Sequence, residues 1–273
     1  MMLIALLLAC QPSDDSGALP FLDWGFAFEV AVTEYRSPVD GSAVAWATVS
    51  NREGEAPPWD LEHSAGDCGF YGVRPQQNCD PSCEPGFTCS WDGECLEATI
   101  PIDGGVIAVD GLEVGLSLEP SGEWVYYGYS FEPEPTDGEI FHPGATISAQ
   151  AAGGTLAPFS LETLGVAALG SDLPCPLADD GGEDLAVTWT PGQPGDRVRL
   201  TLASSNHGSQ FPAVICDVED DGELVVAQEL LQSWMSSSLP VWSWSLVRSH
   251  QGSGVVDGVD VVLSANASEG CSW

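Results

Sequence analysis

The sequence predicts an all-β protein: a β-sandwich, one large or two small, with an inserted disulfide-rich knot. Short runs rich in β-branched and aromatic residues recur along the chain, and turn residues separate them. Gly and Pro contribute 31 and 20 of the 273 residues, as expected for a chain with many tight turns. Only residues 227–234 have apolar residues at helical spacing, and this segment is short.

The expected strands fall into two groups on either side of an acidic, proline-rich stretch at 132–139. Residues 112–118 show the pattern most clearly, because apolar and polar residues alternate there as in a half-buried strand. Residues 53–97 are expected to form a loop and the cysteine knot. The expected strands are 26–35, 43–50, 106–109, 112–118, 123–131, 145–151, 185–190, 198–203, 213–216, 223–226, 241–248 and 259–264.

This pattern predicts a domain organisation in five parts. Residues 1–9 are expected to be a lipoprotein signal peptide, and residues 10–20 a lipidated cysteine with a polar, flexible tether. Residues 21–131 form an N-terminal β region with a Cys-rich insertion at 68–95. The stretch 132–139 is the linker, and residues 140–273 form a C-terminal β-sandwich-like domain.

The charge of the chain excludes some classes of partner. Six residues are basic and 41 are acidic, so the formal net charge is −35. Such a surface repels phosphate backbones, which excludes nucleic-acid binding. It also repels anionic lipid headgroups, so any membrane attachment is covalent or apolar. The six basic residues are all arginine. Two explanations stay open: a GC-rich genome that avoids lysine codons, or life in salt, which screens self-repulsion.

The N-terminal residues predict the compartment. An apolar run over residues 2–9 ends at Cys10, and it is far too short to span a bilayer. Leu7-Leu8-Ala9-Cys10 resembles the lipobox of bacterial lipoproteins, in which the leader is cut before a cysteine whose sulfur receives a diacylglycerol. The resemblance implies lipidation of Cys10. Because Gln11 follows in place of Asp, it also implies the outer membrane or cell surface. A basic segment at the start of the leader is lacking.

The cysteine count agrees with export. Nine cysteines minus Cys10 leave eight, an even number that fits four disulfides formed in an oxidising compartment. The run from Cys79 to Cys95 resembles small Cys-rich knots of myxobacterial and related exported proteins, and this resemblance implies the pairs Cys79–Cys89 and Cys83–Cys95. The run lacks the paired C-x2-C spacing of zinc sites and a nearby histidine. For the remaining four cysteines we expect Cys175–Cys216 and Cys68–Cys271.

A longer resemblance covers residues 140–264. Its motifs are Phe141-His-Pro-Gly, Pro158-Phe159, the run Leu185-Ala-Val-Thr-Trp-Thr-Pro-Gly192, and Val214-Ile-Cys-Asp217. These are similar to motifs of a group of uncharacterised myxobacterial lipoproteins. The resemblance implies a β-rich fold and surface attachment, and it implies no catalytic residue.

One candidate metal site follows Cys216. Asp217, Glu219 and Asp221 occupy the first, third and fifth positions of a possible calcium loop, and Gly222 occupies the sixth. The twelfth position is Gln228, which cannot supply a bidentate carboxylate, and the flanking residues are typical of strands. The alternative is a solvated acidic hairpin turn with Asp-Gly at its tip.

Signals of catalysis are lacking in the sequence. It has no G-x-S-x-G elbow, no P-loop and no H-x-x-x-H pair. The alternating aromatics 124–129 and 242–244 are typical either of a sugar-binding platform or of a sandwich core. We therefore expect a non-enzymatic, lipid-anchored envelope protein with a structural or interaction role and no cofactor. The alternatives are a calcium-dependent or carbohydrate-binding adhesin, with a carbohydrate or protein ligand, and, third, an extracellular hydrolase.

Overall fold

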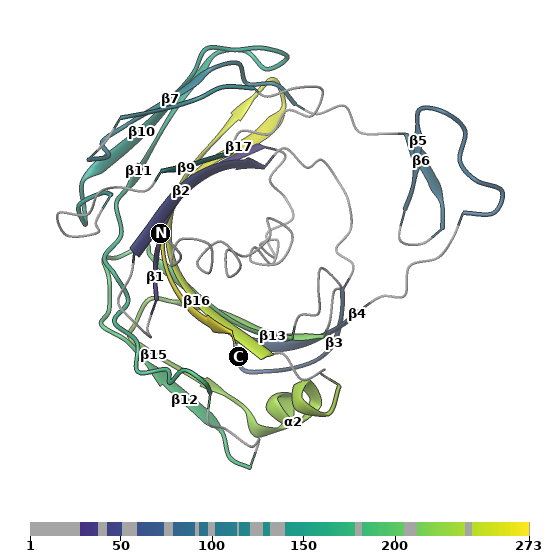
Figure 1. The fold of residues 1–273 in the computed structure, drawn as a ribbon, viewed down its shortest axis with the longest axis vertical. Helices are drawn as coiled ribbons and strands as arrows, with labels where there is room; N and C mark the ends of the chain where they lie inside the picture. The colour runs from purple at the N-terminus through teal and green to yellow at the C-terminus, as the bar shows by residue number, and fades with distance from the viewer. Residues whose placement is uncertain are drawn as a thin grey trace, which may run out of the picture.

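The fold centres on one large curved sheet (Figure 1). The computed structural model describes residues 28–37, 43–50, 59–73, 79–90, 93–97, 102–113, 115–120, 128–131, 140–177, 182–204, 212–237 and 242–272. The large sheet has nine strands, in the order β3 (Trp59–Ala65), β4 (Cys68–Val73), β14 (Ala213–Glu219), β13 (Arg197–Ser204), β16 (Trp242–Val256), β17 (Val259–Ser272), β1 (Phe28–Arg36), β2 (Ala43–Ser50) and β9 (Gly128–Phe131).

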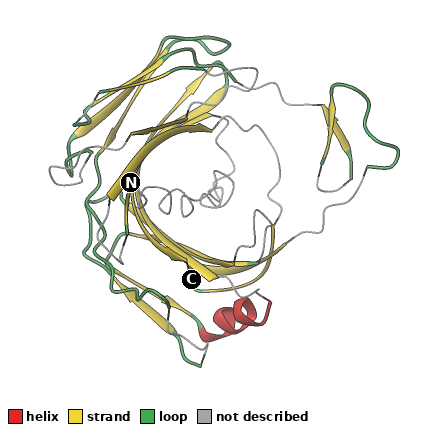
Figure 2. Cartoon of the chain, viewed as in Figure 1, coloured by secondary structure: helices red, strands yellow, loops and turns green. Residues whose placement is uncertain are grey.

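Two further layers cover the outer face of the curve (Figures 1 and 2). One is a four-stranded sheet in the order β11 (Phe159–Leu164), β10 (Thr146–Ala151), β7 (Ile107–Asp110) and β8 (Leu116–Leu118). The other combines β12 (Leu185–Thr188) and β15 (Glu223–Val226) with helix α2 (Gln228–Ser237). A separate hairpin of β5 (Phe87–Cys89) and β6 (Cys95–Glu97) projects from the body. The sequence prediction of an all-β, sandwich-like fold with a disulfide-rich region is confirmed.

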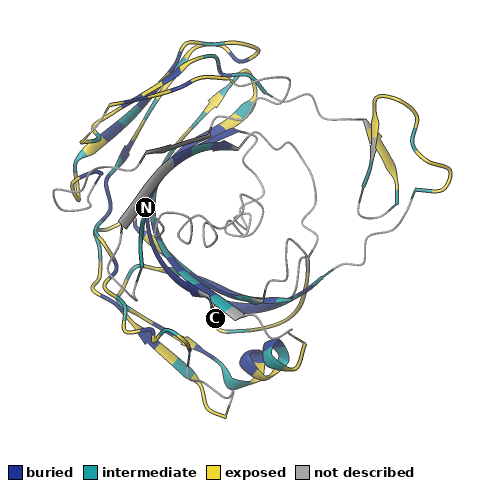
Figure 3. Cartoon of the chain, in the orientation of Figure 1, coloured by how far each residue is buried: buried dark blue, intermediate teal, exposed yellow. Residues whose placement is uncertain are grey.

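Side chains alternate between the two faces of the large sheet. Those on its outer face form two hydrophobic cores with the two covering layers. Phe28, Val30 and Val32 of β1 pack with alternate residues of β17 and with the four-stranded sheet. Leu200 and Leu202 of β13 pack with α2, β12 and β15 in the second core. The intervening residues face the inner side of the curve. Residues 28–34 of β1 and 261–271 of β17 are buried throughout, whereas β16 has exposed residues toward its end (Figure 3).

Polar pairs connect the two central strands on that inner face. β1 and β17 are parallel, whereas the other paired strands are antiparallel. The Ser264 hydroxyl donates to the Glu29 carboxylate, and the amide of Asn266 donates to the Thr33 hydroxyl at 3.3 Å. The Tyr35 hydroxyl donates to the carbonyl of Gly270 at 2.7 Å. These bonds fasten the first strand of the described chain to the last.

The longest strands meet at a turn that the sequence encodes. β16 and β17 form an antiparallel hairpin whose register closes at Val256 and Val259. Asp257 and Gly258 occupy the turn with φ values of 52° and 83°. Positive φ at both central residues defines the tight turn that matches strand twist, and Asp-Gly is a preferred pair for it. Within the described ranges, no helix is long and apolar enough to cross a membrane.

The structure corrects the expected domain organisation in two respects. The stretch 132–139 lies outside the described residues, but strands from both sides of it share the nine-stranded sheet and the four-stranded sheet. The two β regions therefore do not form successive sandwiches. The segment 53–97 also contains two unexpected strands, β3 and β4. Cys68 belongs to β4 in the large sheet, so the compact disulfide module begins at Cys79 rather than at Cys68.

Candidate functional site

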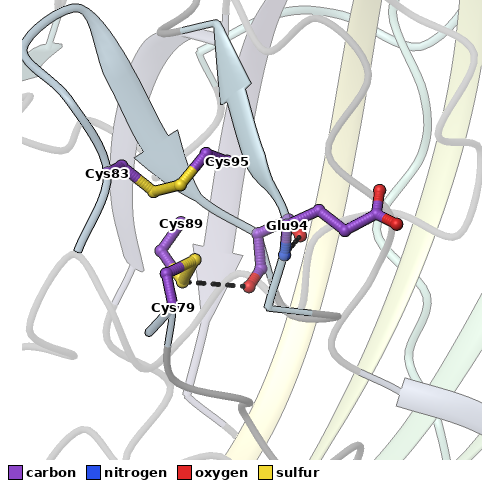
Figure 4. Close-up of a disulfide and its surroundings, with 6 residues drawn as sticks. Cys79, Cys83, Cys89, Glu94 and Cys95 are labelled. Atoms are coloured by element: carbon purple, nitrogen blue, oxygen red, sulfur yellow. Dashed lines mark hydrogen bonds between the residues drawn. A yellow bond between two sulfur atoms is a disulfide. The ribbon is translucent and has the colours of Figure 1, made fainter. Parts of the chain in front are cut away.

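The projecting hairpin is held by two disulfides (Figure 4). Cys79 bonds Cys89 and Cys83 bonds Cys95, the pairing that the resemblance implies. A tight turn closes the hairpin, since the amide of Ser90 donates to the carbonyl of Glu94 at 2.8 Å and the amide of Glu94 donates to the Ser90 hydroxyl at 3.1 Å. The module has almost no apolar interior, because Phe87 and Leu96 are 47% and 45% exposed. The disulfides therefore replace a hydrophobic core.

Three sulfur atoms of this hairpin lie close enough to resemble a metal site. Those of Cys79, Cys83 and Cys89 lie within 4.8 Å of one another. Each belongs to a disulfide, however, and a metal-binding cysteine must be a free thiolate. The cysteines of this run are disulfide-bonded, as their spacing, which differs from that of zinc sites, predicts.

The long-range disulfide pairs predicted from the sequence are wrong. The structure joins Cys68 to Cys216 and Cys175 to Cys271, in place of Cys175–Cys216 and Cys68–Cys271. The reason lies in the sheet order: β4 pairs directly with β14, and Cys68 stands opposite Cys216 with a Cα–Cα distance of 4.0 Å. The other bridge fastens the segment around Cys175, which covers the second core, to the end of β17.

The three calcium candidates do not form a common site. Asp217 and Glu219 lie on the extended strand β14, where alternate residues are about 7 Å apart. The Asp217 carboxylate is bound by the guanidinium groups of Arg197 and Arg199. Asp221 lies in the following turn, and its carboxylate accepts the amide of Glu223 at 3.3 Å. Among the described residues, these carboxylates form no metal-sized cluster. The geometry favours the acidic hairpin turn.

One of the two arginines on Asp217, Arg199, lies near the half-buried phenol of Tyr71. Tyr71 shares the inner face with these residues, across the β4–β14 pair. Burial raises the pKa of Tyr71 above its ordinary value of 10.0; nearby Arg199 acts to lower that pKa, and Asp217 acts to raise it. Burial outweighs the opposing guanidinium, so the folded protein favours the neutral phenol.

This shift predicts a measurable alkaline titration. Because the folded pKa lies above the unfolded one, the stabilisation is complete below pH 10.0 and declines as the pH rises through the folded pKa. We expect Tyr71→Phe to remove a component that titrates above the ordinary tyrosine pKa from the ultraviolet tyrosinate titration of the folded protein, and to flatten the loss of stability in that range. An unchanged titration curve would contradict the shift.

Among the described residues, Arg248 and Asp220 form a fully buried polar centre that the sequence did not indicate. Arg248 of β16 has no exposed side-chain surface, and Asp220, just after β14, has 1%. The Nε atom of Arg248 donates to Asp220 at 2.6 Å, and its Nη1 atom donates to the carbonyls of Ala167 and Ala168 at 2.8 and 3.0 Å. Its Nη2 atom donates to Asp220 and to the carbonyl of Thr190. Arg248 thus joins three chain segments.

Asp220 has further donors that complete the centre. The indole of Trp189 donates to it at 2.6 Å, and the amide of Gly192 donates at 2.9 Å. A Cβ on Gly192 would stand 2.4 Å from both the Asp220 and the Asp196 carboxylates, so only glycine fits between them. Asp196 in turn contacts the Nδ1 atom of His250 at 2.8 Å. Every Asp220 oxygen is satisfied, as a buried charge requires.

Two more buried carboxylates fasten loops to the large sheet. Glu269 of β17 accepts the amides of Gly170 and Ser171, at 2.7 and 3.1 Å, and the Ser171 hydroxyl at 2.7 Å. Glu34 of β1 accepts the amide of Ile140 at 3.1 Å and pairs with Arg36. The recess that these residues line leaves no interior volume for a ligand. Their role is to hold the covering layers in place.

Trp244, from the aromatic run 242–244, belongs to the core. Trp244 is 2% exposed, and its indole donates to the carbonyl of Pro174 at 3.0 Å. The side chains of residues 124–129 and of Trp242 lie outside the described set. For Trp244, the core interpretation therefore replaces the sugar-binding platform.

One serine–histidine contact appears that the sequence did not indicate. The Ser233 hydroxyl of α2 lies 3.0 Å from the Nε2 atom of His63 on β3. That hydroxyl also donates to the Glu229 carbonyl at 2.9 Å, and the pair is exposed. A nucleophilic serine needs an orienting acid behind the imidazole and an oxyanion site. Neither is seen among the described residues around His63.

Cys10 and the tether lie outside the described residues, so its lipidation stays a prediction. Comparison of the chain with protein-family models and with curated proteins finds no significant match.

Proposed function

We propose that this chain is an exported bacterial lipoprotein, anchored through Cys10 at the outer membrane or cell surface, with a structural or interaction role and no enzymatic activity. One observation carries the proposal. The four disulfides use all eight described cysteines, and the ninth cysteine of the chain ends the lipobox-like sequence. Such dense pairing is typical of oxidising compartments.

The buried polar groups support a non-enzymatic role. Asp220, Asp196, Glu269 and Glu34 each bind an arginine, a histidine or backbone amides of covering segments. A catalytic carboxylate must face substrate in a concave pocket. These four carboxylates instead fix loops on the sheet, which is the chemistry of a rigid display scaffold.

Metabolic labelling with radioactive palmitate tests the anchor. We expect label in the wild-type protein expressed in a lipoprotein-processing bacterium, and none in Cys10→Ala, because a diacylglyceryl thioether requires the sulfur of Cys10. The variant is also expected to leave the membrane fraction. Equal labelling of the two proteins would contradict the proposal. Cys79→Ala/Cys89→Ala is the matched control, since it removes sulfur elsewhere and should retain the label.

A further inference from the structure

The charged side chains of the described chain are distributed unevenly. Each of the four described arginines bonds a carboxylate of the same chain: Arg36 bonds Glu34, Arg197 and Arg199 bond Asp217, and Arg248 bonds Asp220. Carboxylates of the chain itself therefore engage all four of these cations. Exposed carboxylates without an arginine partner lie on every layer, including Asp110, Glu119, Glu162, Glu183, Glu223 and Asp260.

Folding concentrates this negative charge. The formal net charge is −35, and the compact state brings carboxylates from distant segments onto one surface. Mutual repulsion destabilises the compact state relative to the expanded chain. Dissolved ions screen it, because the Debye length falls from about 30 Å at 0.01 M to about 8 Å at 0.15 M ionic strength.

We propose that the folded state depends on dissolved counterions, so that ionic strength sets its stability. Monovalent cations suffice, because the effect is screening of the whole surface rather than occupation of a site. A salt-dependent fold favours life in salt, rather than codon usage alone, as the explanation for the lack of lysine. The proposal does not depend on lipidation of Cys10.

Thermal unfolding between 10 and 300 mM salt tests the proposal. We expect the Tm to rise by about 5 to 10 °C over this range, equally in sodium chloride and choline chloride. A Tm that stays constant would overturn the proposal. A second result would also overturn it: a Tm that rises saturably with submillimolar calcium at fixed ionic strength, while monovalent salt alone has no effect. That result would indicate a specific site.

Two variants with the same six substituted positions separate charge from sequence change. The first replaces Asp110, Glu119, Glu162, Glu183, Glu223 and Asp260 with lysine, which changes the net charge from −35 to −35 + 12 = −23. The second exchanges Asp for Glu and Glu for Asp at those positions, which keeps the charge. We expect the lysine variant to have a higher Tm in low salt and a shallower salt dependence. Equal salt dependence in both variants would contradict the proposal.

Discussion

Arg248→Met is expected to lower the free energy of unfolding by about 3 to 5 kcal/mol. The substitution keeps most of the side-chain volume but removes the guanidinium that pairs with Asp220. Asp220, 1% exposed, would then be a buried carboxylate without a counter-charge. The carbonyls of Ala167, Ala168 and Thr190 would lose their donor as well. Urea unfolding followed by tryptophan fluorescence measures the loss.

Arg197→Met is the matched control for this prediction. Arg197 also binds a carboxylate, but its side chain is 52% exposed, so its loss should cost about 1 kcal/mol or less. Combining Arg248→Met with Asp220→Asn should cost less than the sum of the two single variants, because neither then leaves an unpaired charge. Equal losses for Arg248→Met and Arg197→Met would show that the buried centre does not fasten the layers.

Removal of the Cys68–Cys216 disulfide is expected to be the other large effect. This bridge closes a sequence separation of 148 residues, and the chain-entropy model assigns such a loop about 5 kcal/mol, with measured bridges spanning about 0 to 5. Both sulfurs are buried between β4 and β14. We expect Cys68→Ala/Cys216→Ala to lower the urea midpoint of the whole body, because the bridge joins the edge pair β3–β4 to β14 and so to the rest of the sheet.

The hairpin provides a control with the same chemistry. Cys79→Ala/Cys89→Ala removes a bridge with a separation of 10 residues in a module that projects from the body. This variant should leave the main unfolding transition unchanged while protease sensitivity rises within 79–97. If both double variants shift the main transition equally, the hairpin contributes to the core and the description of it as a separate module is wrong.

Local patterns predicted much of the fold. The expected strand at 43–50 coincides with β2, and that at 223–226 coincides with β15, because each is rich in apolar and β-branched residues and is bounded by turn residues. The helical spacing at 227–234 corresponds to α2, whose Leu230, Leu231 and Trp234 are buried. The two local disulfides have the pairing that the resemblance to Cys-rich knots implies.

What the sequence did not predict depends on contacts between distant segments. β3 is polar and lies at the sheet edge, where pairing with β4 rather than hydrophobic patterning holds it. The long-range disulfides depend on which strands are neighbours. Asp220 stands in a run of acidic residues, and nothing local distinguishes it from Asp221, yet one is buried on Arg248 and the other is exposed. Burial of a charge is set by the fold, not by spacing.

The intact mass of the mature protein, purified from membranes, tests the central claim most directly. The account predicts a polypeptide that begins at Cys10 and carries a diacylglyceryl group. It also predicts that alkylation before reduction adds nothing, whereas alkylation after reduction adds eight groups, from the cysteines of the four disulfides. A mass that includes residues 1–9, together with cysteines that alkylate without reduction, would contradict it.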